Sequence, residues 1–229
     1  MCFTKNFMRG RGARSFAYSR NIDGMSDAPS PTQRTADEAL ARLIEGNARF
    51  VAGKARFPTV QKEVLAELAK AQRPYATILG CSDSRVPPEL VFDAGFGELF
   101  IIRVAGNVIS PEVMGTIQYA SVHLKTPLFV VLGHQGCGAV NAALAAKFDG
   151  AQERRHIAAL LQNITPGLTD LDSRLPPDSL MEKAVESNVR WSMHQLLETP
   201  EGKAAQARGV MKLAGAVYEL ETGRVRFLP

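Results

Sequence analysis

The sequence predicts an α/β protein with a mainly parallel β-sheet flanked by helices. Three short apolar runs, at 75–79, 99–104 and 127–132, each end in glycine or a polar cluster and are followed by a helical pattern. This order is typical of β-α-β units, whose strands are buried on both faces of the sheet. The chain has 229 residues, of which 45% are hydrophobic, so it can form one large core. A single folded domain is expected over residues 35–229.

The helices are predicted from hydrophobic residues that recur at helical intervals. Thr35 and Glu38 have the spacing of a capping box, which predicts a first helix over about 35–53. A second, shorter helical pattern ends before Pro74. Later helices are expected at 111–124, 137–148 and 178–198, and a loop rich in proline and glycine at 165–177.

The C-terminal segment is expected to form a β-hairpin. Residues 210–220 and 225–228 are apolar runs, and the turn Glu221-Thr222-Gly223 separates them. No apolar run in the chain approaches the roughly 18 residues that a membrane-spanning helix requires. A membrane partner is therefore not expected.

The positive charge of the chain is concentrated in its first residues. Residues 1–24 carry five basic side chains and one acidic one, which accounts for the whole net charge of +4. The rest of the chain is balanced, so the charge does not indicate a nucleic-acid-binding face. We expect residues 1–34 to form a basic, flexible extension. Its arginines resemble an organellar transit peptide. A plainer interpretation is favoured: an unstructured extension, or a start codon assigned too early, with Met25 beginning the functional chain.

Two of the predicted strands end in unusually polar segments, Gly80-Cys81-Ser82-Asp83-Ser84-Arg85 and Gly133-His134-Gln135-Gly136-Cys137-Gly138. Ligands of open α/β sheets bind beyond the carboxyl ends of the strands, where neighbouring ends meet. Cys81, His134 and Cys137 could meet there, and two thiolates with one imidazole suit zinc. Three protein ligands leave one position open, which is typical of a catalytic site.

Each part of this pattern also has a plainer interpretation. A lone His-x-x-Cys is weak evidence for a metal, because buried cysteines beside hydrogen-bonded histidines are common. Asp83 and Arg85 could form an ordinary surface ion pair. Alternatively, Asp83 could ligate the zinc, or it could accept a proton from zinc-bound water while Arg85 keeps it ionised.

The two motifs together resemble the paired zinc motifs of β-class carbonic anhydrases. The resemblance extends over about residues 35–228. It includes the segments Glu45-Gly46-Asn47-Ala48-Arg49-Phe50, Gly97-Glu98-Leu99-Phe100, Arg103-Val104-Ala105-Gly106-Asn107 and Asn188-Val189. It implies one Zn²⁺ per chain, held by Cys81, His134 and Cys137, and the reversible hydration of carbon dioxide to bicarbonate and a proton.

The resemblance also implies roles for further residues. Zinc-bound hydroxide would attack carbon dioxide, with the Asp83–Arg85 dyad orienting the hydroxide. The amide of Gly138 would bind bicarbonate, and Gln72 would contact substrate from the partner subunit. The apolar pocket for carbon dioxide would include Phe100, Ala105 and Tyr119, although many relatives have valine where this chain has Ala105.

The same resemblance implies a homodimer, which could pair into a homotetramer. The helix over 35–53 would then extend onto the partner subunit. The enzyme would act in the cytoplasm, with organellar targeting by residues 1–24 left open.

Three other functions are alternatives to this one. A zinc hydrolase of the same fold could act on carbon disulfide or carbonyl sulfide, which have a similar linear shape. A non-catalytic zinc- or anion-binding module would be indicated by loss of Asp83 or Arg85, and both are present. A phosphate-binding loop at 133–138 is disfavoured, because no Lys-Ser/Thr follows the glycines.

Overall fold

The computed structural model describes residues 34–56, 62–209 and 211–229. Apart from Arg34, the expected N-terminal extension lies outside these residues, and so do its possible targeting role and the start at Met25. Residues 34–229 form one compact unit.

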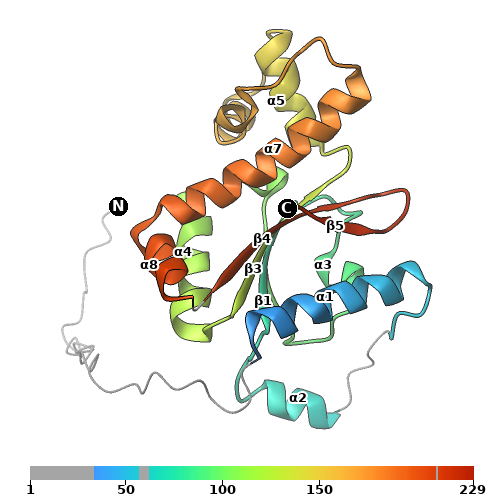
Figure 1. The fold of residues 1–229 in the computed structure, drawn as a ribbon, viewed down its shortest axis with the longest axis vertical. Helices are drawn as coiled ribbons and strands as arrows, with labels where there is room; N and C mark the ends of the chain where they lie inside the picture. The colour runs from blue at the N-terminus through green and yellow to red at the C-terminus, as the bar shows by residue number, and fades with distance from the viewer. Residues whose placement is uncertain (1–33, 57–61, 210) are drawn as a thin grey trace, which may run out of the picture. The chain divides into compact units, whose positions relative to one another are not determined.

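The core of this unit is a five-stranded sheet with the strand order β2-β1-β3-β4-β5 (Figure 1). β1, β2, β3 and β4 pair in parallel, and β5 is antiparallel to β4. The strands are β1 (Ala76–Gly80), β2 (Leu99–Arg103), β3 (Leu128–His134), β4 (Lys212–Tyr218) and β5 (Val225–Phe227). The predicted α/β class with a mainly parallel sheet is confirmed.

Helices cover both faces of the sheet. On one face, α1 (Ala36–Val51) and α3 (Pro88–Val91) enclose a core that includes Leu43, Ile78 and Leu132. On the other face, α4 (Pro111–Tyr119), α5 (Gly138–Phe148) and α7 (Pro177–Glu198) enclose a second core. Every residue of β1 and β3 is buried, which explains why these strands are almost continuously apolar in the sequence.

The first helix begins as its sequence predicts. Thr35 and Glu38 form the reciprocal hydrogen bonds of a capping box, and α1 ends at Val51. α1 packs against the sheet of its own chain through Ala39 and Leu43. Its predicted extension onto a partner subunit stays a prediction. The second helical pattern is α2 (Lys62–Leu68).

Several elements differ from the sequence prediction. The helix expected at 111–124 is α4 followed by the π-helical turn η2 (Ala120–Leu124). The loop expected at 165–177 contains the 3₁₀ turn η3 (Thr165–Leu168). Four elements were not predicted: α3, η1 (Ala105–Asn107), α6 (Arg155–Leu161) and α8 (Pro200–Arg208).

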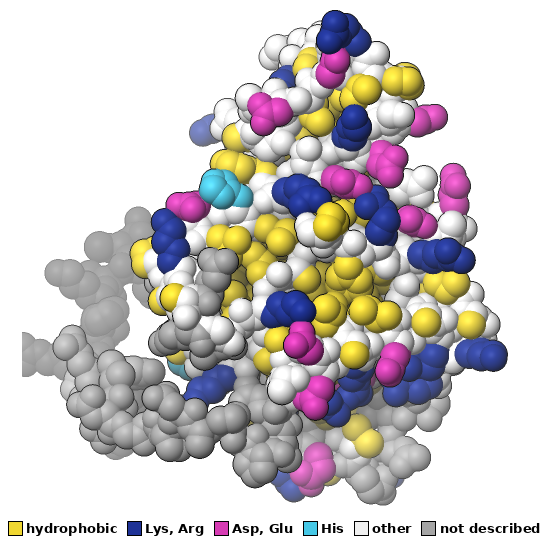
Figure 2. All heavy atoms as spheres, viewed as in Figure 1, with side chains coloured by type: hydrophobic (Ala, Val, Ile, Leu, Met, Phe, Trp, Pro, Cys, Tyr) yellow, Lys and Arg dark blue, Asp and Glu magenta, His cyan; other side chains and the backbone are white. Residues whose placement is uncertain are grey.

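The C-terminal hairpin is present, and its first strand, β4, also pairs with β3 in the parallel part of the sheet. β4 pairs with β5 through only three residue pairs, whereas it pairs with β3 along its whole length. Figure 2 shows hydrophobic side chains gathered between α7 and α1, over the β4–β5 edge of the sheet. Leu213 on β4, Phe227 on β5 and the following Leu228 are only half-buried in the single chain.

No helix among the described residues is both long enough and apolar enough to span a membrane.

Candidate metal centre

The structure brings Cys81, His134 and Cys137 together at the carboxyl-terminal end of the parallel strands. Cys81 follows β1, His134 is the last residue of β3, and Cys137 is the N-cap of α5. β1 and β3 are neighbours, with Gly80 paired to Leu132, so their carboxyl ends adjoin. The two Sγ atoms lie 3.9 Å apart, and the ligand atoms of the three residues all lie within 4.8 Å of one another.

The imidazole of His134 is oriented for a ligand at Nε2. Its Nδ1 lies 2.9 Å from the carbonyl oxygen of Gln135, which accepts a hydrogen bond from Nδ1–H and leaves Nε2 as the acceptor nitrogen. The side chain is fully buried, and within the described part of the chain Nε2 has no hydrogen-bond partner. A buried nitrogen without a partner is costly, and a metal ion bound there would remove that cost. The donor set and its orientation therefore fit zinc.

The sulfurs of Cys81 and Cys137 lie close enough for a hydrogen bond between them. The pKa of Cys81 is lowered, chiefly by its hydrogen bond with Cys137. The pKa of Cys137 is raised, because this bond holds its proton and because the thiol is buried. A zinc ion binds both sulfurs as thiolates, so metal binding would release this proton.

Asp83 lies beside the three candidate ligands as an ionised carboxylate. Its Oδ2 is 3.8 Å from His134 Nε2. Arg85 donates to it from Nη2 at 2.7 Å, and from Nε and the backbone N–H to Oδ1 at 2.9 Å each. These hydrogen bonds hold the pKa of Asp83 well below its usual range. The sequence-predicted dyad is thus formed within the single chain.

Two further residues donate hydrogen bonds to the loop that carries Cys81. Arg103, at the end of β2, donates from Nε to the carbonyl oxygen of Cys81 at 2.9 Å and from Nη2 to that of Asp83 at 2.6 Å. The backbone N–H of Gly106 donates to Cys81 Sγ at 3.3 Å. Both residues lie in a segment that carries the family resemblance, but nothing in the sequence indicates these contacts.

The other predicted site residues fall into two groups. Gly138 begins α5 directly after Cys137, and Ala105 precedes Gly106 in η1, so both belong to the neighbourhood of the cluster. Gln72 is exposed and lies beyond the other end of β1 from Cys81.

Phe100 and Tyr119 also lie away from the cluster. They stack on each other, with ring centroids 6.2 Å apart. Phe100 pairs with Thr77, which precedes Cys81 by four residues, or about 13 Å of strand. The single chain therefore does not bring Phe100, Tyr119 or Gln72 to its own cluster.

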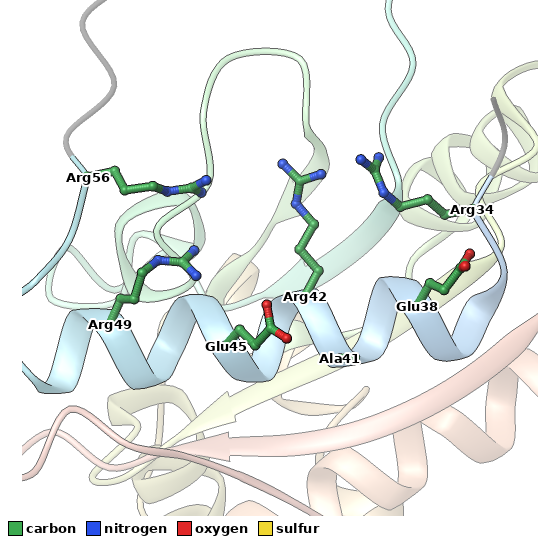
Figure 3. Close-up of a pocket in the computed structure, with 7 residues that line it drawn as sticks. All are labelled: Arg34, Glu38, Ala41, Arg42, Glu45, Arg49 and Arg56. Atoms are coloured by element: carbon green, nitrogen blue, oxygen red, sulfur yellow. The ribbon is translucent and has the colours of Figure 1, made fainter.

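A separate hollow of about 550 Å³ lies along α1, away from these residues (Figure 3). Its lining residues are Arg34, Glu38, Ala41, Arg42, Glu45, Arg49 and Arg56. Arg42 forms an ion pair with Glu98, and Arg49 and Arg56 both bind Asp93. The hollow contains none of the candidate metal ligands, and carboxylates balance its arginines, so we do not assign the active site to it.

Fold and site together define an α/β protein with a Cys₂His cluster that could hold a metal ion and an adjoining Asp–Arg dyad at the carboxyl ends of two parallel strands. Residues 76–225 match the family model described as carbonic anhydrase. The chain belongs to the β-class carbonic anhydrase family.

Its relatives cover most of the chain. It is 41% identical over 190 residues to carbonic anhydrase 2 of Mycobacterium tuberculosis, covering 81% of this chain and 89% of the relative. It is 40% identical over 188 residues to the carbonic anhydrase of Mycolicibacterium smegmatis, covering 82% and 90%. The solved structure of the β-carbonic anhydrase CcaA has a TM-score of 0.69 at 30% identity, covering 83% of this chain and 95% of that one. The expected family and enzyme class are confirmed.

Proposed function

We propose that this enzyme interconverts carbon dioxide and bicarbonate with one Zn²⁺ per chain, held by Cys81, His134 and Cys137. One observation carries the proposal: the three donor atoms lie within 4.8 Å of one another, beside a carboxylate that an arginine keeps ionised. Two sulfurs and one imidazole nitrogen suit zinc, and three protein ligands leave a position for substrate chemistry.

When bound, a zinc ion lowers the pKa of a water molecule toward neutrality. Asp83 supplies the acceptor that orients the attacking water. Arg85 donates two hydrogen bonds to Oδ1 and one to Oδ2, so Oδ2 can accept a further hydrogen bond, and it is the oxygen that lies 3.8 Å from His134 Nε2. Since the pKa of Asp83 is low, the carboxylate keeps this role throughout the neutral range.

The product would be held at the start of α5. Gly138 is the first residue of this helix, and the first backbone N–H groups of a helix have no partner within it. A helix N-terminus also favours negative charge, so the Gly138 N–H suits an oxygen of bicarbonate. An added Cβ at Gly138 would meet no atom within 4 Å outside its chain neighbours and its own helix, so no other element packs on this side of the residue.

The pocket for carbon dioxide would need a second copy of the chain. Gln72, Phe100 and Tyr119 lie away from the cluster of their own chain, whereas Ala105 lies next to it. Tyr119 is 47% exposed and Val122 is 62% exposed, and large apolar groups of this kind suit a contact between subunits. The half-buried β4–β5 edge in Figure 2 offers a further surface for pairing dimers. We therefore propose a homodimer that can form a tetramer, with Gln72, Phe100 and Tyr119 completing the partner's site.

A zinc hydrolase of carbon disulfide or carbonyl sulfide is the second candidate. It would use the same three ligands, but the curated relatives at 40% identity or more are carbonic anhydrases, which favours carbon dioxide.

One set of assays tests both candidates. Zinc content of the purified protein would be measured together with stopped-flow hydration of carbon dioxide and with hydrolysis of the two sulfur compounds. We expect one zinc per chain and rapid hydration. Hydrolysis of a sulfur compound without hydration would contradict the proposal, as would full hydration by a metal-free protein.

A further inference from the structure

The sulfur of Cys81 receives a hydrogen bond from a residue that is itself tightly held. Gly106 donates its N–H to Cys81 Sγ at 3.3 Å. Its φ of 68° lies in the left-handed region that favours glycine, and an added Cβ would meet Ile164 Cδ1 at 2.7 Å. Packing and backbone conformation therefore limit the positions that this N–H can take.

The other side of Gly106 is held by α7. Asn188 donates from Nδ2 to the carbonyl oxygen of Gly106 at 2.8 Å, across 82 residues of sequence. Gly106 is thus bonded at both its N–H and its carbonyl. One bond goes to the candidate metal ligand and the other to a buried helix.

The position of α7 is in turn fixed against the strand that carries His134. A Cβ on Gly133 would meet Val189 Cγ2 at 2.6 Å, so the helix approaches β3 more closely than any larger residue would allow. Asn188 is adjacent to Val189 and only 1% exposed. α7 therefore packs against one ligand strand and reaches the loop that donates to the Cys81 sulfur.

Burial of the Asn188 side chain at this position costs free energy of folding. Within the described residues its Oδ1 is buried and has no hydrogen-bond partner. Burying an amide that uses only its NH₂ group costs more than burying a leucine of similar size. The amide supplies a hydrogen-bond donor to the carbonyl oxygen of Gly106, which a leucine could not do.

We infer that Asn188 is a positioning residue for the metal centre: it holds Gly106 so that the Gly106 N–H donates to the Cys81 thiolate. The inference rests on the proposed zinc site. A hydrogen bond to a thiolate draws electron density from the sulfur and fixes its direction, and loss of such outer partners typically lowers metal affinity by about 10- to 100-fold.

The test compares Asn188→Leu with Ser192→Ala. Ser192 lies one turn further along α7, is equally buried, and donates to the carbonyl oxygen of Asn107 at 3.0 Å. Ser192→Ala removes two buried hydrogen bonds between the same helix and Asn107, at 3.0 and 3.5 Å, and leaves the hydrogen bonds of Gly106 in place. Asn188→Ser is a smaller change that also loses the reach to Gly106, and it decides the question if the leucine variant does not fold.

Two measurements apply to each folded variant. Zinc affinity is determined by competition with a chelator, and the Co²⁺-substituted protein reports the sulfur-to-metal charge-transfer band. For the Asn188 variants we expect about 10- to 100-fold weaker zinc binding and a shift of this band to lower energy, because the sulfur loses its hydrogen bond. Ser192→Ala should match the wild type in both.

The results separate this inference from the proposed function. Wild-type affinity and an unshifted band in the Asn188 variants would overturn the inference and leave the zinc site standing. Equal losses in Ser192→Ala would also overturn it, since the effect would then be general to α7. A wild-type protein that binds neither Zn²⁺ nor Co²⁺ would overturn both.

Discussion

Arg85 binds the carboxylate of Asp83 with the same three hydrogen bonds that join Arg174 to Asp172. In each pair the backbone N–H and Nε donate to Oδ1 and Nη2 donates to Oδ2, all between 2.7 and 3.0 Å. Both segments are Asp-Ser-Arg, then a hydrophobic residue, then Pro-Pro, and the second proline begins a helix in each. The Asp–Arg pair is therefore a local turn that the short sequence specifies.

What distinguishes Asp83 is its location. Its side chain is 18% exposed and lies 3.8 Å from His134 Nε2, whereas that of Asp172 is 46% exposed. Arg174 thus offers a matched control for Arg85. Both arginines occupy the same turn and carry the same charge, and only one lies at the candidate metal centre.

The first prediction follows from this comparison. Arg85→Ala should lower the hydration rate constant by about 100-fold or more, because Asp83 loses the group that orients it. Zinc content should stay at one per chain, since Arg85 is not a ligand. Arg174→Ala should keep the wild-type rate. Stopped-flow hydration and metal analysis of the two variants would check this, and equal rates in both would contradict the role of the dyad.

The second prediction concerns the metal ligands. Cys137→Ser should lose most of the zinc and the activity together, because a serine hydroxyl is a far weaker zinc ligand than a thiolate. Cys2→Ser is the control, since Cys2 is the only other cysteine besides Cys81. Metal analysis beside the hydration assay gives the answer. Retention of full activity by a zinc-free Cys137→Ser protein would be incompatible with the proposed site.

The third prediction concerns the shared site. Gln72→Ala and Cys137→Ser should each impair activity alone, and their co-expression should restore about a quarter of it. Half of the dimers would then be mixed, each with one intact site built from an unaltered Gln72 of one chain and the unaltered ligands of the other. Hydration by the co-expressed, purified mixture would be compared with that of the two single variants mixed after purification. If co-expression restores nothing, Gln72 does not act across subunits.

The fourth prediction concerns stability and pH. The side chain of Asp93 is only 2% exposed. It accepts hydrogen bonds from Arg49 Nε at 2.6 Å and from Arg56 N–H and Nε at 2.7 and 2.9 Å. Burial alone would raise the pKa of Asp93, but these bonds outweigh it and lower the pKa. A lowered folded-state pKa stabilises the protein above the unfolded pKa, near 4, and this contribution is lost as the pH falls through the folded value.

Asp93→Asn should therefore reduce the free energy of unfolding at pH 7 by about 1.5–3 kcal/mol, and the difference from wild type should shrink in acid. Asparagine tolerates the φ of 46° at this position, so the variant tests charge rather than backbone strain. Denaturant unfolding at several pH values measures the difference. Asp172→Asn removes the charge of an exposed pair and should have a much smaller effect; a comparable loss there would argue against the buried pair.

The sequence predicts those parts of the fold and site that depend on local patterns. The parallel strands, α1 with its capping box, and α7 follow from periodicity and turn residues. The Asp83–Arg85 pair is equally local, and its repetition at 172–174 was a signal that could have shown it to be a preformed turn.

The contacts that tune the centre depend instead on tertiary structure. Arg103 and Cys81 are 22 residues apart in sequence, and Asn188 and Gly106 are 82 apart. Their side-chain types are ordinary for the strand end and helix on which they lie. Only the pairing of β1 with β2 and the packing of α7 against β3 bring them together, so no spacing in the sequence could reveal them.

The unequal burial around the centre has a consequence for how the enzyme is loaded with metal. His134 is fully buried and Cys137 and Cys81 are 1% and 5% exposed, whereas the side chain of Asp83 is 18% exposed. Of these four residues Asp83 is the most exposed, and its charge is balanced by that of Arg85. Burial of the three ligands, rather than a local charge, would therefore limit how fast a chelator extracts the ion.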